Sequence, residues 1–483
     1  MSEEIKNLQP VAVWNHFYGL TQIPRPSKHE EKIQAYIMSF GERLGLKTVK
    51  DEVGNIIIRK PATPGMENRK GVILQAHLDM VPQKNSGNPH DFTKDPIETF
   101  IDGEWVKAKG TTLGSDNGIG VSAALAILES KEIAHGPLEA LFTSDEETGM
   151  TGANGLKPGL LEGEILLNMD SEDEGELYVG CAGGVDTVAN FDFKEEKVPS
   201  GHVACLVMLT GLKGGHSGLD IHLGRGNANK IMNQLLMEAT VNFSVRLASI
   251  HGGTLRNAIP RESEVVVTVP VKNLVPFLAF VNTFGESVKK TFSEADPGLK
   301  IKAETTALPA FVIDKYTAED LMRAIDMCPN GVTGWSKDFP GVVETSSNLA
   351  VVKSVNNTIE IGSLQRSQVD AEKEKLANII YDVFHQNGAR AAIVSPYPGW
   401  KPDINSAILQ TMKGVYHKKY GRIPEVKVIH AGLECGILGA AYPHWDMISF
   451  GPTIRNPHSP DEMVNIPSVA KFWEFLLETL KAV

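Results

Sequence analysis

The chain has 483 residues, which is more than one hydrophobic core normally holds, so we expect at least two domains. Its net charge of −12, with no basic stripe to offset it, argues against a nucleic-acid partner. The sequence has no apolar run that could cross a bilayer, no secretory signal pattern and no Cys-x-x-Cys pair, so a cytoplasmic protein without a membrane partner is expected.

The first third of the chain alternates between predicted strands and helices. Ser27 and Glu30 have the spacing of a capping box, which predicts a helix that ends at Gly45. A second helix, rich in small residues, is expected over 121–129. Strands are expected at 55–59, over the run Val72–Leu74 that leads into His77, at 138–143 and at 165–169. This alternation indicates an α/β fold with a mostly parallel central sheet flanked by helices.

From about residue 187 the pattern changes to that of an α+β insert. Helices are expected near 227–239, 273–291, 317–327 and 371–386, and strands near 203–209, 241–250, 264–271, 300–306, 342–353, 358–363 and 390–395. Pro396–Pro402 has the composition of a linker, beyond which helices and strands alternate again. We therefore predict a discontinuous catalytic domain, 1–186 and 397–483, interrupted by an insert over 187–396.

Polar residues that could bind metal follow the predicted strands. His77 and Asp79 are two positions apart at the end of the predicted strand that begins at Val72, so their side chains leave this strand on one side. The carboxyl end of such a strand is where ligands usually bind. Taken alone, this pair is more simply explained as a histidine satisfied by a neighbouring acid.

Other candidate metal ligands also follow predicted strands or lie in loops with glycine or proline. They are Asp116 in a glycine-rich loop, Glu146 and Glu147 after the strand at 138–143, Asp170 after the strand at 165–169, and His458 in a loop with two prolines. Several carboxylates brought to one sheet edge repel each other unless cations neutralise them. Carboxylates with two imidazoles and no thiolate suit Zn²⁺, Co²⁺ or Mn²⁺ in an open catalytic site. The loop Gly114–Gly120 could be mistaken for a phosphate loop, but it lacks the Lys-Ser/Thr of a P-loop.

Six motifs, in this order, carry a resemblance to one superfamily. They are His77-x-Asp79, Gly114-x-Asp116-Asn-Gly118, Asp145-Glu146-Glu147-x-Gly149, Asp170 after a strand, Gly214-Gly-His216-Ser-Gly218 and His458-Ser-Pro-Asp461-Glu462. With them the chain resembles the co-catalytic zinc exopeptidases of the carboxypeptidase G2/carnosinase superfamily. Within it, the whole chain is similar to the bacterial aminoacyl-histidine dipeptidases, a group also called cytosol non-specific dipeptidases or peptidase D.

The resemblance implies two Zn²⁺ per chain, for which Co²⁺ or Mn²⁺ could substitute. Asp116 would bridge the metals, with His77 and Asp170 on one and Glu147 and His458 on the other. The peptide bond after Asp116 would be cis. Many members of the superfamily have a second aspartate at the following position, where this chain has asparagine.

The resemblance also implies the remaining roles. Asp79 would orient and polarise His77, and Glu146 would act as general base and then general acid on a metal-bridging water. Residues implied to bind substrate are His216 at the oxyanion, Asn257 and Arg366 at the substrate carboxylate or backbone, and Gly432 and Glu434 near its amino group. For Arg366 a position on a surface strand is the simpler alternative.

We therefore predict a homodimeric enzyme that hydrolyses unblocked dipeptides, including Xaa-His dipeptides, with the insert as a lid and dimerisation domain. An N-acyl amino acid deacylase or a tripeptide aminopeptidase on the same scaffold is the nearest alternative. Faster cleavage of an N-blocked substrate than of a free dipeptide would favour it. A non-catalytic, metal-dependent binding protein is the alternative from another class.

Overall fold

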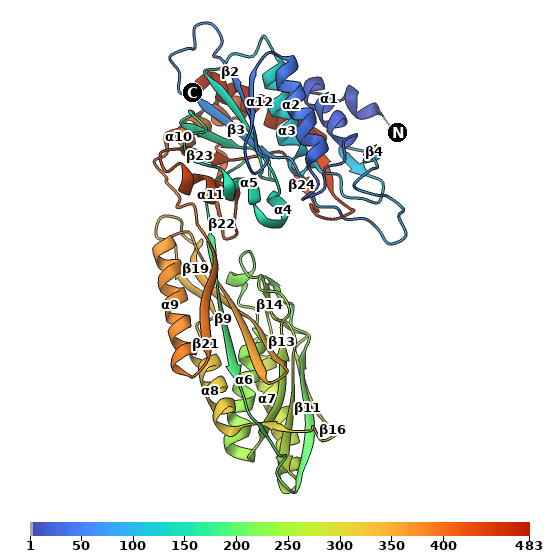
Figure 1. Ribbon diagram of the computed structural model, residues 1–483, viewed down its shortest axis with the longest axis vertical. Helices are drawn as coiled ribbons and strands as arrows, with labels where there is room; N and C mark the ends of the chain where they lie inside the picture. Colours follow the sequence, from blue (N-terminus) through green and yellow to red (C-terminus); the bar gives the residue numbers. More distant parts are fainter. Residues whose placement is uncertain (1–2) are drawn as a thin grey trace. The chain divides into compact units, whose positions relative to one another are not determined.

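The structure, a computed structural model, describes residues 3–483 and divides into two compact units (Figure 1). The first unit contains the chain up to Cys181 together with Trp400–Val428 and Leu433–Val483. The second unit contains Ala182–Gly399 and Ile429–Gly432. The division into a discontinuous catalytic domain, 1–186 and 397–483, and a lid and dimerisation domain, 187–396, stays a prediction.

An eight-stranded sheet forms the centre of the first unit, in the order β1-β2-β6-β3-β7-β23-β8-β22. These strands are β1 Lys47–Lys50, β2 Ile56–Lys60, β3 Val72–His77, β6 Leu138–Thr143, β7 Ile165–Asn168, β8 Glu176–Cys181, β22 Glu425–Ile429 and β23 Asp446–Ser449. The four inner strands, β6, β3, β7 and β23, run parallel, and β2 and β8 pair antiparallel with them. Both β3 and β6 are buried along their whole length, as expected of inner strands covered on both faces.

Helices flank this sheet, as the sequence pattern predicted (Figure 1). They are α1 Val11–Thr21, α2 Glu31–Arg43, α3 Ser115–Glu129, α10 Ala407–Tyr420, α11 Glu434–Ala441 and α12 Ile466–Ala482, with the short α4 Glu146–Gly149 and α5 Thr151–Gly155. Helix α3 packs against α1 and β3, and it is buried almost throughout because its residues are small and apolar. A small sheet in the order β24-β25-β5-β4 completes the unit, with β4 Thr99–Asp102, β5 Trp105–Ala108, β24 Ile454–Arg455 and β25 Met463–Asn465.

The second unit has the α+β composition that the sequence predicted. Its main sheet has the order β16-β11-β15-β13-β19-β20-β9-β21, with β18 paired to β19, and its registered pairs are antiparallel. The strands are β9 Gly183–Asp192, β11 His202–Thr210, β13 Arg246–Gly252, β15 Ser263–Pro270, β16 Lys300–Thr306, β18 Gly331–Trp335, β19 Val343–Val355, β20 Thr358–Ser367 and β21 Arg390–Tyr397. Four helices, α6 Ala228–Phe243, α7 Leu274–Thr291, α8 Lys315–Met327 and α9 Asp370–Gln386, share one apolar core with the sheet.

Three local expectations are wrong. Helix α2 begins at Glu31 without a side-chain cap, because Ser27 donates its hydrogen bond to Asp79 instead. The strand expected over 241–250 begins only at Arg246, since α6 continues to Phe243. The segment predicted as a linker is hydrogen-bonded to the rest of the chain instead. Strand β21 extends to Tyr397, and two backbone hydrogen bonds, of 2.9 and 3.0 Å, join Trp400 to Cys181. Strands β8 and β9 were not predicted.

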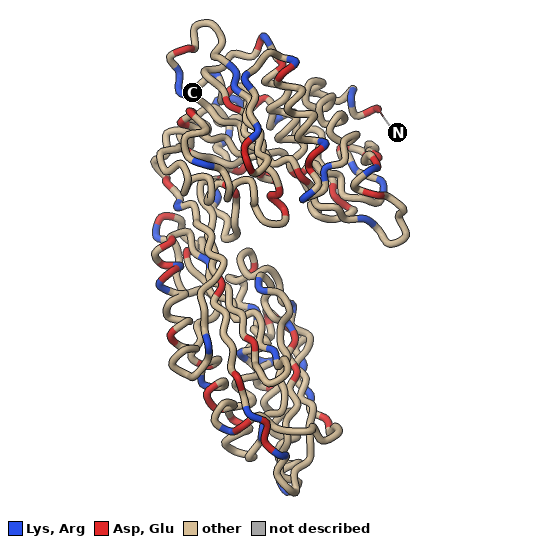
Figure 2. Tube along the Cα trace, in the orientation of Figure 1, with Lys and Arg blue, Asp and Glu red and all other residues tan. Residues whose placement is uncertain are grey.

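Acidic and basic residues are intermixed along both units (Figure 2). In residues 3–483, no helix combines the length and apolar character that a membrane span requires.

Candidate active site

The carboxyl ends of three parallel strands bring the predicted metal ligands together. His77 is the last residue of β3, Asp170 lies two residues beyond β7, and Glu146 follows β6 after a two-residue turn. Because parallel strands end at the same edge of a sheet, these side chains meet there. The sequence pattern predicted this convergence, and the structure has it.

Asp116 lies between two groups of donor atoms. Its Oδ1 is 3.0 Å from His77 Nε2, which is also 3.3 Å from Asp170 Oδ1. Its Oδ2 is 3.3 Å from His458 Nε2, which is also 2.9 Å from Glu147 Oε2. In each group of three residues the ligand atoms all lie within 4.8 Å of one another. The two oxygens of one carboxylate therefore belong to two adjacent sites.

This donor set fits two divalent cations. Each group offers one imidazole nitrogen and carboxylate oxygens, which is the chemistry that Zn²⁺, Co²⁺ and Mn²⁺ accept. Oε1 of Glu147 is buried and has no hydrogen-bond partner among residues 3–483, as expected of an atom free to bind a metal. The Asp116–Asn117 peptide bond is cis, as the resemblance implied, and the Asn117 amide donates to Asp170.

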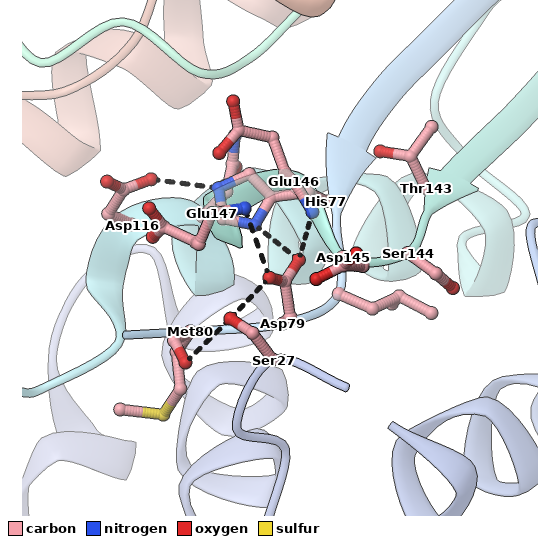
Figure 3. A network of polar contacts seen from close by, with 12 residues as sticks. Ser27, His77, Asp79, Met80, Asp116, Thr143, Ser144, Asp145, Glu146 and Glu147 are labelled. Carbon is pink, nitrogen blue, oxygen red and sulfur yellow. Dashed lines mark hydrogen bonds and ion pairs between the residues drawn. The ribbon is translucent and has the colours of Figure 1, made fainter. Parts of the chain in front are cut away.

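Asp79 ties the end of β3 to the start of α4 (Figure 3). Its Oδ1 lies 3.3 Å from His77 Nδ1 and accepts the backbone N–H of Glu146 at 3.0 Å. Its Oδ2 accepts the N–H of Glu147 at 3.2 Å and the hydroxyl of Ser27 at 2.7 Å. Burial alone would raise the pKa of Asp79, but the contact with His77 and these hydrogen bonds hold that pKa at about 2.

Glu146 and Glu147 occupy the first turn of the short helix α4. Successive helical residues are rotated by about 100° about the helix axis, so the two carboxylates point apart. Glu147 contacts His458, whereas no side chain among residues 3–483 hydrogen-bonds the carboxylate of Glu146. Burial, together with the charges of Asp170, Glu434 and Glu147, raises the pKa of Glu146 well above its ordinary value.

The same excess of negative charge raises the pKa values of His77 and His458. Hydrogen bonds to Asp116 and Glu147 raise the pKa of His458 to about 11. Burial opposes protonation of His77, but the charge of Asp170 and the hydrogen bonds to Asp116 and Asp170 raise its pKa well above the ordinary value. Each imidazole thus sits where a cation is strongly favoured, which is the electrostatic condition of a metal site.

The loop that carries His458 is held by a short hairpin. Strands β24 and β25 pair on either side of residues 456–462, and β25 also pairs with β5. His458 has a positive φ of 59° within this loop, and its side chain is about half exposed. The hairpin therefore returns a ligand from the far end of the sequence to Asp116.

A buried polar network lies beside these ligands, around Glu434 at the start of α11. Oε2 of Glu434 accepts hydrogen bonds from Gln75 at 2.6 Å and Thr143 at 2.8 Å. Its Oε1 is buried without a partner among residues 3–483. Burial raises the pKa of Glu434 to about 7, and the charge of Asp170 adds to the shift while His77 opposes it. The carboxylate predicted near the substrate amino group is thus in the first unit, with one oxygen free.

His216 lies in the second unit with a defined tautomer. Its Nδ1 accepts the backbone N–H groups of Gly218 at 3.2 Å and Leu219 at 3.1 Å. The remaining proton must then be on Nε2, which is left as a donor. The turn requires glycine, because a Cβ at Gly218 would lie 2.0 Å from the carbonyl oxygen of His430. Asp220 accepts the N–H of His216 at 2.8 Å and so braces the loop.

Arg366 and Asn257 adjoin the same loop. Arg366 is buried on β20, where its Nη1 donates to the Tyr397 hydroxyl at 2.8 Å and its Nε to Ser217 Oγ at 3.4 Å. The backbone oxygen of Asn257 accepts the N–H of Ser217 at 2.8 Å, while its side chain is exposed. Gly432 is in the segment Ile429–Gly432 of the second unit. The surface-strand alternative for Arg366 is therefore wrong.

Several residues around the site were not predicted. Arg25 is buried and donates to the carbonyl oxygens of Leu78, at 2.8 Å, and Gly114. Glu462 is buried and accepts backbone N–H groups of the loop before Asp116. No local pattern marks a buried arginine, but Glu462 belongs to the same motif as His458 and could have been considered with it.

Comparison with known proteins identifies the family of this chain. Residues 73–482 match peptidase family M20/M25/M40. The chain is 46% identical to the cytosol non-specific dipeptidase of Escherichia coli over 480 residues, 99% of each protein. The crystal structure of an aminoacylhistidine dipeptidase from Vibrio alginolyticus is 47% identical, with a TM-score of 0.94 over 100% of this chain and 98% of that one. The aminopeptidase PepT of Bacillus cereus is 15% identical and shares the fold, with a TM-score of 0.56 over 98% and 99% of the two chains. These matches confirm the resemblance in the motifs: the chain belongs to peptidase family M20/M25/M40.

Proposed function

We propose that this peptidase hydrolyses unblocked dipeptides, including Xaa-His dipeptides, with two metal ions per chain. The observation that carries the proposal is the Asp116 carboxylate, one oxygen of which contacts His77 and the other His458. The carboxylate of Glu146 lies close to His77 and Glu147 in the same cluster. Full-length similarity to enzymes named as dipeptidases supports the substrate class.

We assign His77 and Asp170 to one metal, Glu147 and His458 to the other, and Asp116 to both. Zn²⁺ is the proposed metal, and Co²⁺ or Mn²⁺ should substitute because both accept imidazole and carboxylate ligands. When bound, such a pair lowers the pKa of a water and polarises the scissile carbonyl. Asp79, whose Oδ1 lies 3.3 Å from Nδ1 of His77, would orient this imidazole so that Nε2 is available to the metal, as carboxylates commonly do for ligating histidines.

Glu146 is the proposed proton carrier. Among residues 3–483 no side chain hydrogen-bonds its carboxylate, and its raised pKa suits a group that accepts a proton from water and returns it to the leaving amine. The backbone bonds of Glu146 and Glu147 to Asp79 fix the start of α4. These bonds therefore fix the separation between Glu146, the proposed base, and Glu147, the proposed metal ligand.

The second unit is proposed to supply substrate contacts and to act as a lid. Nε2–H of His216 is the donor proposed for the oxyanion of the tetrahedral intermediate. Arg366 would bind the substrate carboxylate, since a guanidinium can bond both oxygens at once, and Asn257 would bind the carboxylate or backbone. Gly432 and Glu434 are proposed near the substrate amino group, where the free Oε1 of Glu434 could accept a bond from an ammonium.

We also propose a homodimer in the cytoplasm. The four scattered cysteines, with no Cys-x-x-Cys pair in the sequence, fit this compartment, as does the relative named as a cytosol enzyme. The second unit would then form the dimer contact. Sedimentation at micromolar concentration should give a species of twice 52.5 kDa, and a single 52.5 kDa species would contradict the assembly.

The experiment that tests the function is metal reconstitution of chelator-treated protein with Zn²⁺, Co²⁺ or Mn²⁺. Substrates are β-Ala-His, Gly-His, Leu-Gly, a tripeptide and an N-acetylated amino acid. Activity should return with metal and be confined to free dipeptides. Faster cleavage of the acetylated substrate or of the tripeptide would replace the proposal by a deacylase or a tripeptide aminopeptidase.

The variant Glu146→Gln separates an enzyme from a metal-dependent binding protein. It should bind metal as the parent chain does and lose turnover by at least about 10²-fold, because only the proton carrier is removed. Retained turnover would contradict the assignment of Glu146. Metal binding without cleavage of any substrate by the parent chain would favour the binding protein.

A further inference from the structure

Glu462 is a buried carboxylate with an unusual set of partners. It is 2% exposed and lies four residues after His458, in the same loop. Its Oε2 accepts the backbone N–H groups of Leu113 at 2.8 Å and Gly114 at 3.0 Å. Its Oε1 accepts the N–H and the hydroxyl of Ser115, at 2.8 and 2.6 Å, and lies 3.4 Å from the N atom of Asp116. Four successive backbone N–H groups thus converge on one side chain.

These N–H groups form an anion-binding turn at the start of α3. Gly114 has a φ of 71°, and a Cβ there would lie 2.6 Å from the Arg25 guanidinium, so the turn needs glycine. Successive N–H groups that point into one concavity bind anions, as they do in phosphate loops. The sequence of this segment resembles a phosphate loop for that reason. In this protein, the carboxylate of Glu462 occupies the position that a phosphate would take.

The turn is held from its other side as well. Arg25 donates to the carbonyl oxygens of Leu78 and Asp79, each at 2.8 Å, and to that of Gly114. The segment before Asp116 is therefore fixed through its N–H groups by Glu462 and through a carbonyl by Arg25. Arg25 joins it to the strand end that carries His77, and Glu462 joins it to the loop that carries His458.

We propose that Glu462 is a positioning residue that sets the separation between Asp116 and His458. Both residues are assigned to the metal that Glu147 also binds, so the inference rests on the proposed function. Among residues 3–483, the hydrogen bonds of Glu462 and the contact of His458 with Asp116 join the loop of His458 to the Asp116 segment, so without Glu462 that contact alone would remain. Glu462 should therefore control the affinity of that metal more than that of the metal on His77 and Asp170.

Glu139 provides a matched control. It is also a buried glutamate, 6% exposed, and accepts the N–H groups of Glu162 at 2.7 Å and Gly163 at 2.8 Å. It lies near the start of β6, whereas the active site is at the end of that strand. A general loss of a buried, hydrogen-bonded carboxylate would affect Glu139→Gln as much as Glu462→Gln.

The experiment titrates chelator-treated protein with Co²⁺, following visible absorption and competition with a chelator, for the parent chain, Glu462→Gln, Glu139→Gln and Ser115→Ala. Glutamine keeps the size of Glu462 but turns an amide N–H₂ toward backbone N–H groups. Glu462→Gln should weaken one of two Co²⁺ sites by about 10–100-fold, the range typical for lost partners of metal ligands, and change the other by less than about 3-fold. Ser115→Ala should weaken the same site by less, because only the hydroxyl bond is lost.

Three outcomes would overturn the proposal: unchanged affinity of both sites in Glu462→Gln, an equal loss in Glu139→Gln, or only one Co²⁺ site in the parent chain. A double variant with His458→Gln adds a further check. The effect of Glu462→Gln should largely disappear in that background, since both changes act on one metal. If the parent chain binds two Co²⁺ and cleaves no dipeptide, the proposed function fails, while the comparison of affinities still decides the role of Glu462.

Discussion

Oδ1 of Asp79 accepts the backbone N–H of Glu146 at 3.0 Å and lies 3.3 Å from Nδ1 of His77 (Figure 3). One carboxylate oxygen therefore contacts both a proposed metal ligand and the backbone of the proposed base. The ligand comes from the end of β3 and the base from the start of α4, so neither element alone fixes their separation. Asp79 couples them, and Ser27 fixes Asp79 in turn.

Replacing Asp79 with Asn should reduce both catalysis and metal affinity. The amide would present N–H₂ to at least one backbone N–H of Glu146 or Glu147, and it would not stabilise His77 as a charged acceptor does. We expect kcat to fall by about 10–100-fold and metal affinity by a similar factor. Steady-state kinetics and chelator competition measure the two effects.

Ser27→Ala is the matched control for that change. It removes one hydrogen bond to Asp79 and leaves the carboxylate charged, so we expect a loss of only a few-fold in kcat. Equal losses in Ser27→Ala and Asp79→Asn would contradict a specific role of the Asp79 charge.

His216→Gln tests the donor proposed for the oxyanion. Because two backbone N–H groups hold Nδ1, the imidazole presents Nε2–H without needing to be protonated. Losing one such donor typically costs about 10²–10³ in kcat. We expect a fall of that size, with little change in KM and in the thermal midpoint of unfolding. A rise in KM with unchanged kcat would instead assign His216 to ground-state binding.

Much of the first unit could be predicted because its signals are local. A buried strand followed by His77, or by Glu146 and Glu147, is readable from a few neighbouring residues. The contacts that hold these groups are not local: Ser27 meets Asp79 across 52 positions, and Glu462 meets Ser115 across 347. Ser27 was assigned to a helix cap for this reason, since its capping signal is local and its real partner is distant.

The substrate residues illustrate the same limit. The glycine-rich motif around His216 is visible in sequence, but its tautomer depends on the turn that places two N–H groups at Nδ1. Arg366 was implied to bind substrate, with a surface strand as the alternative, and its contact with Tyr397 depends on how β21 lies along β9. Motif spacing therefore predicted identities, whereas the geometry of each side chain required the folded chain.

Arg366→Lys should weaken recognition of a free carboxylate. Arg366 is buried between Tyr397 and Ser217, and lysine cannot reproduce its planar set of donors. We expect KM for a dipeptide to rise by about 10–100-fold with a smaller change in kcat, because the contact is made in the ground state as well as the transition state. Tyr397→Phe, which removes one partner of the guanidinium, should give a smaller rise.

Dipeptide amides provide the matching substrate test. The parent chain should discriminate strongly against an amide, and Arg366→Lys should reduce that discrimination. Equal cleavage of dipeptides and their amides by the parent chain would contradict a carboxylate site at Arg366.

Because His430 is buried in its neutral form, the stability of the second unit should fall at acid pH. Burial and the nearby charge of Arg366 lower the pKa of His430 to about 3, and its Nε2 lies 2.7 Å from Ser346 Oγ. An unfolded histidine has a pKa of about 6.5. Between these values the unfolded chain binds a proton that the folded chain does not. The stability from neutral His430 is therefore complete above pH 6.5 and is lost as the pH falls toward 3, by at most about 1.4 kcal/mol per pH unit.

His430→Gln should remove this dependence. We expect the variant to be less stable than the parent chain at pH 7.5, because the buried contact with Ser346 is disturbed, and the difference to narrow steadily between pH 6.5 and 4.5. Urea unfolding of chelator-treated protein at four pH values measures it without interference from metal loss. His444→Gln, at an exposed position, is the matched control substitution. A stability difference that stays constant over this pH range would mean that His430 does not set the acid limit of this unit.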